Sequence, residues 1–482
     1  MASGSLKSLT AATLASFFVL SGCAKDVGPI NLMHSTIPAA SAPFIPDSGD
    51  DGSTVIALAF SGGGTRAAAF SYGVLTALDD LVVDELPYRR SMVDNIRMIS
   101  GTSGGAVLAA YFGLRGRDDY RDFDTRFLYR NAEKSMHTNP LSPITLARAV
   151  SGGANDRSSF AYWLDENLYD NATFKGFRAP NAPQVWINAS DIFNHSPFLF
   201  TYDTFAALCS DLDSVRISDA VAASAAAPVI FTPIVLEARR DSCDYKRPAW
   251  LTRALEKESG STRLESYAHA LSSYHHRQDI NYVKLLDGGL TDNLGITGFA
   301  LERAASATPH GPLSAEQAVK LRHLLFIVTD AGQFQTADWA RQLHGPTVAP
   351  LVQTAIRTSM AASVLHELDA LIMAMREWRS ELIAFRCGLS QSAVKRMRGT
   401  LDGWNCRDVD VSVEHLSFAD LDEPLATTLS AVPTRLTLPR EQVDQLIAAG
   451  RETVTGSQKI MTTLRKIQHD ADVRENLLVA AR

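Results

Sequence analysis

The 482-residue sequence lacks an excess of basic residues, since 46 Lys and Arg stand against 53 Asp and Glu, for a formal net charge of −7. This mild acidity gives no sign of a nucleic-acid partner or of a patch for anionic lipids. The paired CxxC and HExxH spacings of metal sites are also missing, so we expect no metal, and we expect no cofactor. No internal repeat is visible, and no apolar run after the first 22 residues is long enough to predict a second transmembrane segment.

The first 22 residues have the features of a signal peptide. Lys7 and the free amine supply positive charge, and the apolar run from Thr10 to Leu20 is too short to span a bilayer. The run ends in Leu20-Ser-Gly-Cys23, which resembles a bacterial lipobox, where cleavage before the cysteine leaves it diacylated at the new amino terminus. We therefore predict a lipoprotein signal peptide over residues 1–22 and lipid attachment at Cys23. An ordinary signal peptide with an incidental cysteine is the alternative.

Residues 23–52 are rich in Pro, Ser, Ala, Gly and Asp, a composition that disfavours helix and favours turns. We interpret them as a tether between membrane and globule, with an arm packed on the domain as the alternative. By resemblance to other lipoproteins, Ala24 after the cysteine favours sorting to the outer membrane. The expected location is thus the bacterial cell envelope, lipid-anchored, facing the periplasm or the outside. Oligomeric state is not indicated.

Cysteine is scarce, with five residues in the whole chain. Apart from Cys23, four remain, an even number in a chain that is predicted to be exported, and an oxidising compartment favours disulfides. Proximity in sequence favours Cys209 with Cys243 and Cys387 with Cys406. Buried free thiols are an equally open interpretation.

A glycine loop opens the globular part. The unbroken apolar run Val55–Phe60 is typical of a strand buried on both faces, and it enters Ser61-Gly-Gly-Gly-Thr65 before a helix-forming stretch, residues 67–78. Amides that converge at a helix start can bind an anion. A nucleotide site would need the Walker pattern or GxGxxG, and neither is present. An oxyanion hole for acyl transfer is the better interpretation.

Residues 96–111 have the layout of a nucleophile elbow. A β-forming approach runs into Gly101-Thr-Ser103-Gly-Gly105, and helix-forming residues follow at once. Glycines allow the sharp strand-to-helix turn that would expose the hydroxyl of Ser103. A third stretch, Asp287-Gly288-Gly289, follows a β-like segment, so Asp287 is expected at a strand end. A turn-forming aspartate is the alternative, but the other two motifs favour a catalytic role.

In this order, GGGxR, GxSxG and DGG resemble the motifs of the patatin-like phospholipase family. The resemblance implies a three-layer α/β fold with a mostly parallel central sheet flanked by helices. It implies a catalytic domain over residues 53–335, followed by a mostly helical part, 336–482, packed on the same domain. It also implies a Ser–Asp dyad of Ser103 and Asp287. The oxyanion donors would be the amides of Gly62, Gly63 and Gly64, assisted by that of Gly104. For Arg66, a phosphate headgroup and a structural ion pair are both open.

Three further segments are less specific. The apolar spacing in residues 348–382 predicts a long helix, with core packing the default and a membrane-facing patch the alternative. Residues 409–421 alternate like a strand. Residues 274–277 are predicted to form a solvated loop, and His195 near Asp191 is read as a hydrogen-bonded loop histidine rather than a metal or triad residue.

The first functional hypothesis is a serine acyl-hydrolase that cleaves lipid esters through an acyl-enzyme. A second is an α/β-hydrolase-type esterase with a histidine triad, because histidines follow Asp287 in the chain. A third is an inactive envelope lipoprotein that uses the fold for binding. The expected partners are a lipid or ester substrate and the membrane, with no nucleic acid.

Overall fold

The computed structural model describes residues 26–36, 46, 50–85, 88–134, 136–137, 139, 142–150, 152–239, 242–258, 260–333 and 338–480. The predicted signal peptide over residues 1–22, Cys23 and half of the tether over residues 23–52 lie outside the described residues. The described residues 26–36 pack on the domain, since the amide of Ile30 donates to the carbonyl of Val235 and Asn31 is buried, as the alternative of a packed arm predicts. Within the described part of the chain, no helix combines the length and the apolar character that crossing a bilayer would require.

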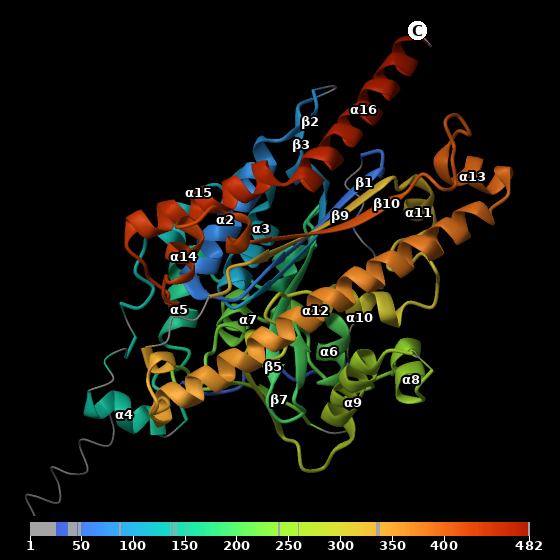
Figure 1. Cartoon of the computed structure of the whole chain (residues 1–482). Helices are drawn as coiled ribbons and strands as arrows, with labels where there is room; N and C mark the ends of the chain where they lie inside the picture. The colour runs from blue at the N-terminus through green and yellow to red at the C-terminus, as the bar shows by residue number, and fades with distance from the viewer. Residues whose placement is uncertain are drawn as a thin grey trace, which may run out of the picture.

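The centre of the molecule is a sheet of eight strands (Figure 1). Its order is β10-β9-β1-β4-β5-β8-β7, and β6 pairs with β5. The pairs from β10 to β5 are parallel, whereas β6, β7 and β8 pair antiparallel. The strands are β1 Thr54–Phe60, β4 Ile96–Thr102, β5 Gln184–Asp191, β6 Ser196–Leu199, β7 Ile234–Glu237, β8 Tyr282–Asp287, β9 His323–Asp330 and β10 Asp410–Ser417; β2 Val82–Asp84 and β3 Arg90–Ser91 form a separate ribbon.

Helices cover both faces of the sheet. They are α2 Gly64–Asp80, α3 Gly104–Asp119, α4 Pro143–Val150, α5 Phe160–Leu164, α6 Tyr202–Ala207, α7 Ile217–Ser224, α8 Ala249–Leu255, α9 Thr262–His276, α10 Thr297–Ala305, α11 Ala315–Lys320, α12 Val348–Cys387, α13 Gln391–Arg398, α14 Leu425–Ser430, α15 Arg440–Gly456 and α16 Gln458–Ala480. Because side chains of a strand alternate between faces, Ile56 and Leu58 join the core with α2 and α3, while Val55 and Ala57 join the core with α10 and α12. The predicted three-layer α/β fold with a mostly parallel sheet is confirmed.

The segment after residue 336 contributes to the same core. Strand β10 pairs along the whole of β9, and α15 packs along α2. Gly73 and Gly450 allow the two helices to approach closely. A Cβ on Gly73 would overlap the carbonyl of Ile447, and a Cβ on Gly450 would overlap the carbonyl of Phe70. The amide of Thr65, at the start of α2, also donates to the carbonyl of Arg435 at 2.7 Å. The glycine loop is therefore held in part by residues more than 360 positions later.

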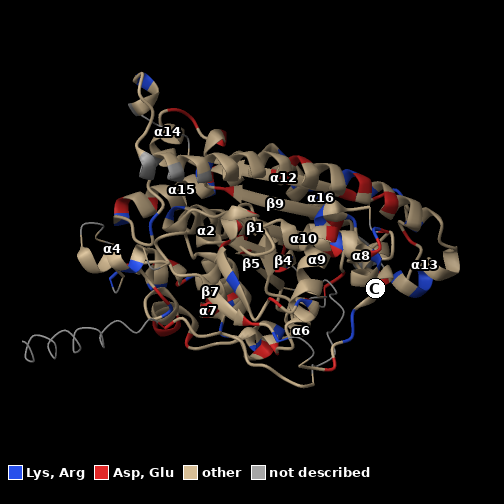
Figure 2. Ribbon diagram, turned by 90° about the horizontal axis from the view of Figure 1, so that it is seen from below, with Lys and Arg blue, Asp and Glu red and all other residues tan. Residues whose placement is uncertain are grey.

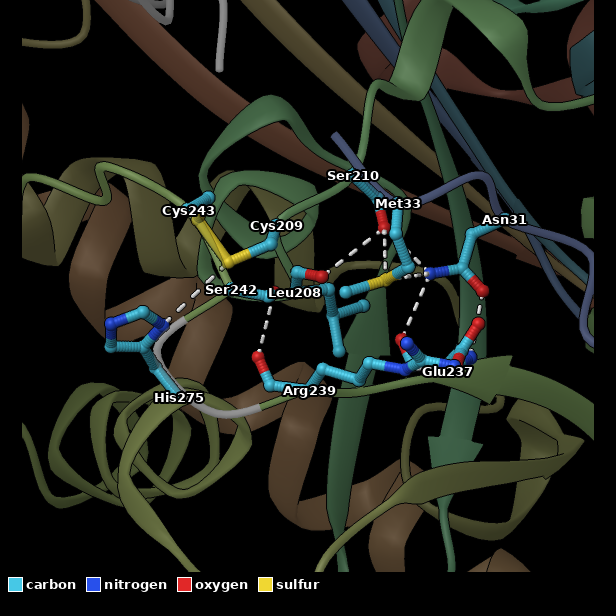
Figure 3. The surroundings of a disulfide bond; sticks show 10 residues. All are labelled: Asn31, Met33, Leu208, Cys209, Ser210, Glu237, Arg239, Ser242, Cys243 and His275. Atoms are coloured by element: carbon cyan, nitrogen blue, oxygen red, sulfur yellow. Dashed lines mark hydrogen bonds and ion pairs between the residues drawn. A yellow bond between two sulfur atoms is a disulfide. The ribbon is translucent and has the colours of Figure 1, made fainter. Parts of the chain in front are cut away.

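Two disulfides join Cys209 to Cys243 and Cys387 to Cys406, so the favoured pairing is confirmed. Figure 3 shows the first, with the imidazole Nδ1 of His275 3.8 Å from Cys209 Sγ. The prediction of a solvated loop at residues 274–277 is wrong, because α9 runs to His276 and both Tyr274 and His275 are buried. The hydroxyl of Tyr274 donates to the carboxylate of Asp191, a contact that no local sequence signal reveals.

Candidate active site

Ser103 lies in a sharp turn between β4 and α3. Its backbone has φ 52° and ψ −119°, a conformation that non-glycine residues rarely adopt. A Cβ on Gly104 would overlap the carbonyl oxygen of Gly64, so the turn packs directly against the glycine loop and requires glycine there. Strain of this kind is found where the fold holds a functional side chain in a fixed position. Ser103 is only 7% exposed.

The Ser103 hydroxyl donates to Asp287 Oδ2 at 3.0 Å. Asp287 is the last residue of β8, and its other carboxylate oxygen accepts the amide of Gly289 at 2.8 Å. Its backbone is held as well, since its amide donates to Ala226 and its carbonyl accepts the hydroxyl of Ser190. Two strand ends that are 184 residues apart in sequence thus bring a serine hydroxyl and a buried carboxylate into direct contact.

Burial raises the pKa of Asp287 to about 6 from its ordinary 3.8, because the charged form is poorly solvated beneath the surface. The hydrogen bonds from Gly289 and Ser103 act in the opposite direction but only partly offset burial. At neutral pH the carboxylate therefore remains ionised, yet it is a stronger base than a solvent-exposed aspartate. A base whose pKa approaches the working pH transfers protons more effectively.

The glycine loop lies against the serine, but not all of its amides are free. The amide of Gly62 donates to the carbonyl of Asn293 at 2.9 Å, so the prediction of Gly62 as an oxyanion donor is corrected: this N–H is already used within the fold. Among the described residues, the amides of Gly63, Gly64 and Gly104 have no acceptor. Gly64 and Gly104 begin α2 and α3, where the first amides of a helix lack internal partners.

Arg66 is buried, and its guanidinium donates to backbone carbonyls. Its Nε donates to the carbonyl of Ala331 at 2.9 Å, and its Nη1 donates to that of Val432 at 2.6 Å. Burial lowers its pKa to about 10, with a further contribution from Arg357. Within the described residues these bonds go to backbone carbonyls and Arg66 forms no salt bridge, so the structure supports a structural role that differs from the ion pair considered above. The arginine clamps the turn after β9 and residue 432 beside the glycine loop.

Two residues without a predicted role hold the elbow from below. Ser224 Oγ accepts the amide of Ser103 at 2.8 Å, and Asn188 Nδ2 donates to the carbonyl of Gly101 at 2.8 Å. Ser224 is the last residue of α7 and follows Ala222 and Ala223. Because α7 also contains Ser218, its sequence gives no signal that distinguishes Ser224.

No histidine of the described part of the chain hydrogen-bonds to Ser103 or Asp287. The later histidines have other surroundings: His323 contacts Asp470 at 2.8 Å, His415 lies 3.5 Å from Asp330, and His310 contacts the carbonyl of Leu313. His195 is an exposed residue of the turn between β5 and β6, and the carboxylate of Asp191 accepts the amides of Phe193 and Asn194 instead. The cluster of Cys209, Cys243 and His275 has donor atoms within 4.8 Å, but its two sulfurs are bonded to each other.

Comparison with protein families finds a match to the model described as "Patatin-like phospholipase" over residues 58–300, which contain Ser103 and Asp287. Among solved structures, VipD from Legionella pneumophila is similar at 15% identity and a TM-score of 0.33, covering 94% of this chain and 73% of VipD. Human GIVD cytosolic phospholipase A2 is similar at 14% identity and a TM-score of 0.40, covering 87% of this chain and 61% of that enzyme. Comparison with curated protein sequences finds no match.

Proposed function

Because this chain belongs to the patatin-like phospholipase family, we propose that it is a serine hydrolase that cleaves carboxylic ester bonds of lipids. Ser103 is the nucleophile and Asp287 the base. The observation that carries the proposal is the 3.0 Å hydrogen bond from the Ser103 hydroxyl to Asp287 Oδ2, made at the apex of a strained strand-to-helix turn. A serine hydroxyl is a weak nucleophile until a neighbouring base accepts its proton.

The reaction begins with transfer of the Ser103 proton to Asp287 Oδ2 as the serine oxygen attacks the ester carbonyl carbon. The resulting tetrahedral intermediate carries a negative oxygen. The amides of Gly63, Gly64 and Gly104 are the donors for it, because they have no acceptor among the described residues and belong to the glycine loop and to the two helix starts that pack on each other next to Ser103. When the intermediate collapses, the protonated Asp287 gives its proton to the leaving alkoxide, and the acyl group stays on Ser103.

Water then completes the cycle. Asp287, ionised again, accepts a proton from a water molecule that attacks the acyl-serine carbonyl, and the same amides hold the second oxyanion. Collapse returns the proton to Ser103 and releases a fatty acid. One carboxylate thus serves both half-reactions, and its second oxygen stays oriented by Gly289 throughout.

A histidine-triad esterase and an inactive binding protein are the other two hypotheses. The triad is disfavoured because both oxygens of Asp287 already accept hydrogen bonds, from Ser103 and Gly289, and leave no place for a histidine between acid and serine. The inactive protein is disfavoured because serine, carboxylate and free loop amides converge at one point. Neither alternative has an observation of its own in its favour.

A fluorophosphonate probe and a soluble p-nitrophenyl ester test the proposal together. We expect the wild-type chain to be labelled and to hydrolyse the ester, and Ser103→Ala to lose both. Ser71→Ala is a matched control, since Ser71 is a buried serine of α2 that bonds to Thr329 and not to Asp287. A wild-type chain that is folded but neither labelled nor active would refute the proposal.

The cellular location is part of the same proposal. We place the catalytic domain at the bacterial envelope, held by acyl chains on Cys23 through the segment over residues 23–52, of which residues 26–36 pack on the domain. Support comes from the lipobox-like sequence that precedes Cys23. Several acyl chains on one residue would anchor the protein stably, since each buried CH₂ contributes about 0.8 kcal/mol.

A further inference from the structure

Several large apolar side chains are exposed on α4, on the turn at residues 227–230 and on the first part of α12. We name this surface the apolar rim and define it by Ile144, Leu146, Val150, Val229, Ile230 and Leu351, all large apolar residues that are exposed. We propose that the apolar rim docks on a lipid bilayer that contains anionic lipid, and that it presents the dyad to ester bonds in that bilayer. The inference rests on the proposed function for its substrate class.

Helix α4 exposes its large apolar side chains and buries a polar one. Its Thr145 is 8% exposed, whereas Leu146 is 60% and Val150 83% exposed. A helix on the surface of a soluble domain normally buries its apolar stripe and exposes its polar residues. The reversal places the apolar side chains of α4 in contact with the surroundings, as in helices that lie in the plane of a membrane interface.

The turn at residues 227–230 also exposes apolar side chains. Val229 has φ 72°, an outlier for a β-branched residue, and its side chain is 65% exposed. The exposed apolar side chain of Val229 is unfavourable in water, which points to a second environment for this turn. The carbonyls of Val229 and Ile230 accept the amides of Ala154 and Asn155, so the turn is joined to the segment that follows α4.

Two of the segments that carry the apolar rim also reach the surroundings of the dyad. Three residues before Val229, the carbonyl of Ala226 accepts the amide of Asp287. Helix α12 reaches the same point, because a Cβ on Gly289 would lie 2.7 Å from the side chain of Met360. Leu351 is two and a half turns earlier on this helix. Figures 1 and 2 both place α4 and the beginning of α12 at the same end of the molecule.

The charges of these elements suit an anionic surface. Arg148 is the only ionisable residue of α4, and residues 348–366 of α12 contain Arg357 and His366 but no acidic residue. In Figure 2 the charged residues of α12 gather in its later half. This distribution contrasts with the whole chain, which carries a net charge of −7. Anionic headgroups would therefore meet no like charge on α4 or on the first half of α12.

A bilayer is the occupant that best explains these features together. Ser103 is only 7% exposed, so an ester must leave the surrounding phase to reach it, and a docked rim would let a lipid enter without crossing water. Exposed apolar patches beside a reactive group mark membrane or protein contacts, and the substrate class proposed above is itself a bilayer component. A second copy of this chain or another protein remains an outcome of the test.

An environment-sensitive thiol probe tests docking without relying on turnover. The full chain carries Cys23→Ala, so that its remaining cysteines are paired and a new cysteine is the single labelling site. Leu146→Cys and Leu351→Cys report on the apolar rim. Val473→Cys is the control, because Val473 is exposed and belongs to α16, a helix that runs toward the end of the molecule opposite to α4 (Figure 1). Vesicles of phosphatidylcholine, with and without 30% phosphatidylglycerol, are added as the partner.

We expect probe emission at residues 146 and 351 to rise and shift to the blue with phosphatidylglycerol vesicles, and brominated acyl chains to quench it, while residue 473 is unaffected. No change at the apolar rim, or an equal change at residue 473, would overturn docking. Equal binding to vesicles without phosphatidylglycerol would overturn the anionic preference. A shift that appears on concentrating the protein alone would indicate a second copy instead and would also overturn the proposal.

A kinetic comparison separates this inference from the proposed function. Leu146→Asp is expected to lower hydrolysis of vesicle phospholipid about tenfold or more, because an apolar side chain is lost from the interface and a charge is added. Its kcat/KM on a soluble p-nitrophenyl ester should not change, and Val473→Asp should change neither rate. If the wild-type chain hydrolyses no ester but the probes still report docking, the proposed function fails and the docking surface stands. Equal vesicle hydrolysis by Leu146→Asp and wild type would overturn the surface alone.

Discussion

Replacing Asp287 by Asn is expected to abolish turnover and, at the same time, to stabilise the fold above pH 6. The substitution keeps the shape of the side chain, so an amide oxygen can still accept the amide of Gly289 and an amide nitrogen can face Ser103. It removes the basicity that the mechanism needs, and a positioned base contributes about 10²–10⁴-fold. The free energy of unfolding should rise while turnover falls, because the substitution also removes a charge that is buried in the folded wild-type chain.

The magnitude follows from the pKa of Asp287, which burial raises from 3.8 to about 6. A folded-state pKa above the unfolded value means that the folded chain binds the proton more tightly. The stability that the protonated group contributes is therefore present below pH 3.8 and is lost as pH rises through 6. A pKa difference of one corresponds to 1.36 kcal/mol, so the full loss is about 3 kcal/mol, of which about half falls between pH 5 and pH 8.

Urea unfolding of the wild type and of Asp287→Asn at pH 5 and pH 8 measures this effect. Other titrating groups cancel when the two proteins are compared at each pH, so the variant should gain about 1.4 kcal/mol relative to the wild type on going from pH 5 to pH 8. Ser103→Ala is the control, since it loses turnover but keeps Asp287 and its pH-dependent cost. The kcat/KM of the wild type on a soluble ester should fall below about pH 6 as Asp287 becomes protonated.

Two results would refute the reasoning. If Asp287→Asn retained turnover close to that of the wild type, the carboxylate would not be the base. If the stability difference between the two proteins were the same at pH 5 and pH 8, or the acid limb of kcat/KM lay near pH 4, Asp287 would not be the buried, perturbed group described above. Refolding of the variant, followed by circular dichroism, establishes that lost turnover is not lost structure.

Further predictions concern the glycine loop, the lipid anchor and the disulfides. Gly63→Ala places a Cβ 3.0 Å from Arg66 Nη2 at a φ of +143°, and displacing one oxyanion donor should lower kcat by roughly 10²–10³-fold. The matched control is Gly116→Ala, because Gly116 also has a positive φ but no neighbour within 4 Å of the position that its added Cβ would take. Equal kcat for the two variants would remove the loop from the mechanism. Cys23→Ala should abolish palmitate labelling and release the protein from membranes, and labelled protein from this variant would exclude acylation at Cys23. Replacing both Cys209 and Cys243 by Ser should lower the free energy of unfolding by about 4 kcal/mol, because this disulfide closes a loop of 34 residues. The same change at Cys387 and Cys406, which close a loop of 19 residues, should lower it by about 3 kcal/mol. Unchanged urea midpoints would show that neither bond constrains the unfolded chain.

The elements that bear the site could be predicted because each has a local chemical signature. The apolar run before Ser61 forms β1, the glycines around Ser103 permit its turn, and Asp287 ends β8 where paired glycines follow. Strand β10 was also visible as an alternating segment. Its place beside β9 was not, because nothing in the sequence of a strand specifies which distant strand supplies its hydrogen bonds.

The remaining details depend on partners far away in the chain. Gly62 is indistinguishable from Gly63 in sequence, and only the position of Asn293 decides which amide is already bonded. Arg66 finds its acceptors 265 and 366 residues later, so its role in the fold has no local signal. Tyr274 and His275 have the composition of a polar loop, yet they close α9 against Asp191 and a disulfide. Tertiary contacts override local preference at each of these positions.

The close crossing of α15 on α2 sets the order in which the enzyme can mature. Helix α2 begins at the glycine loop, and its Gly73 packs at the crossing with Gly450 of α15. The amide of Thr65, also in α2, donates to the carbonyl of Arg435. During synthesis, Ser103 and Asp287 emerge well before either partner exists. The glycine loop and α2 can take these contacts only after residue 450 has been made. Under the mechanism proposed above, a ribosome-bound or prematurely terminated chain would therefore carry Ser103 and Asp287 without a complete site for the oxyanion.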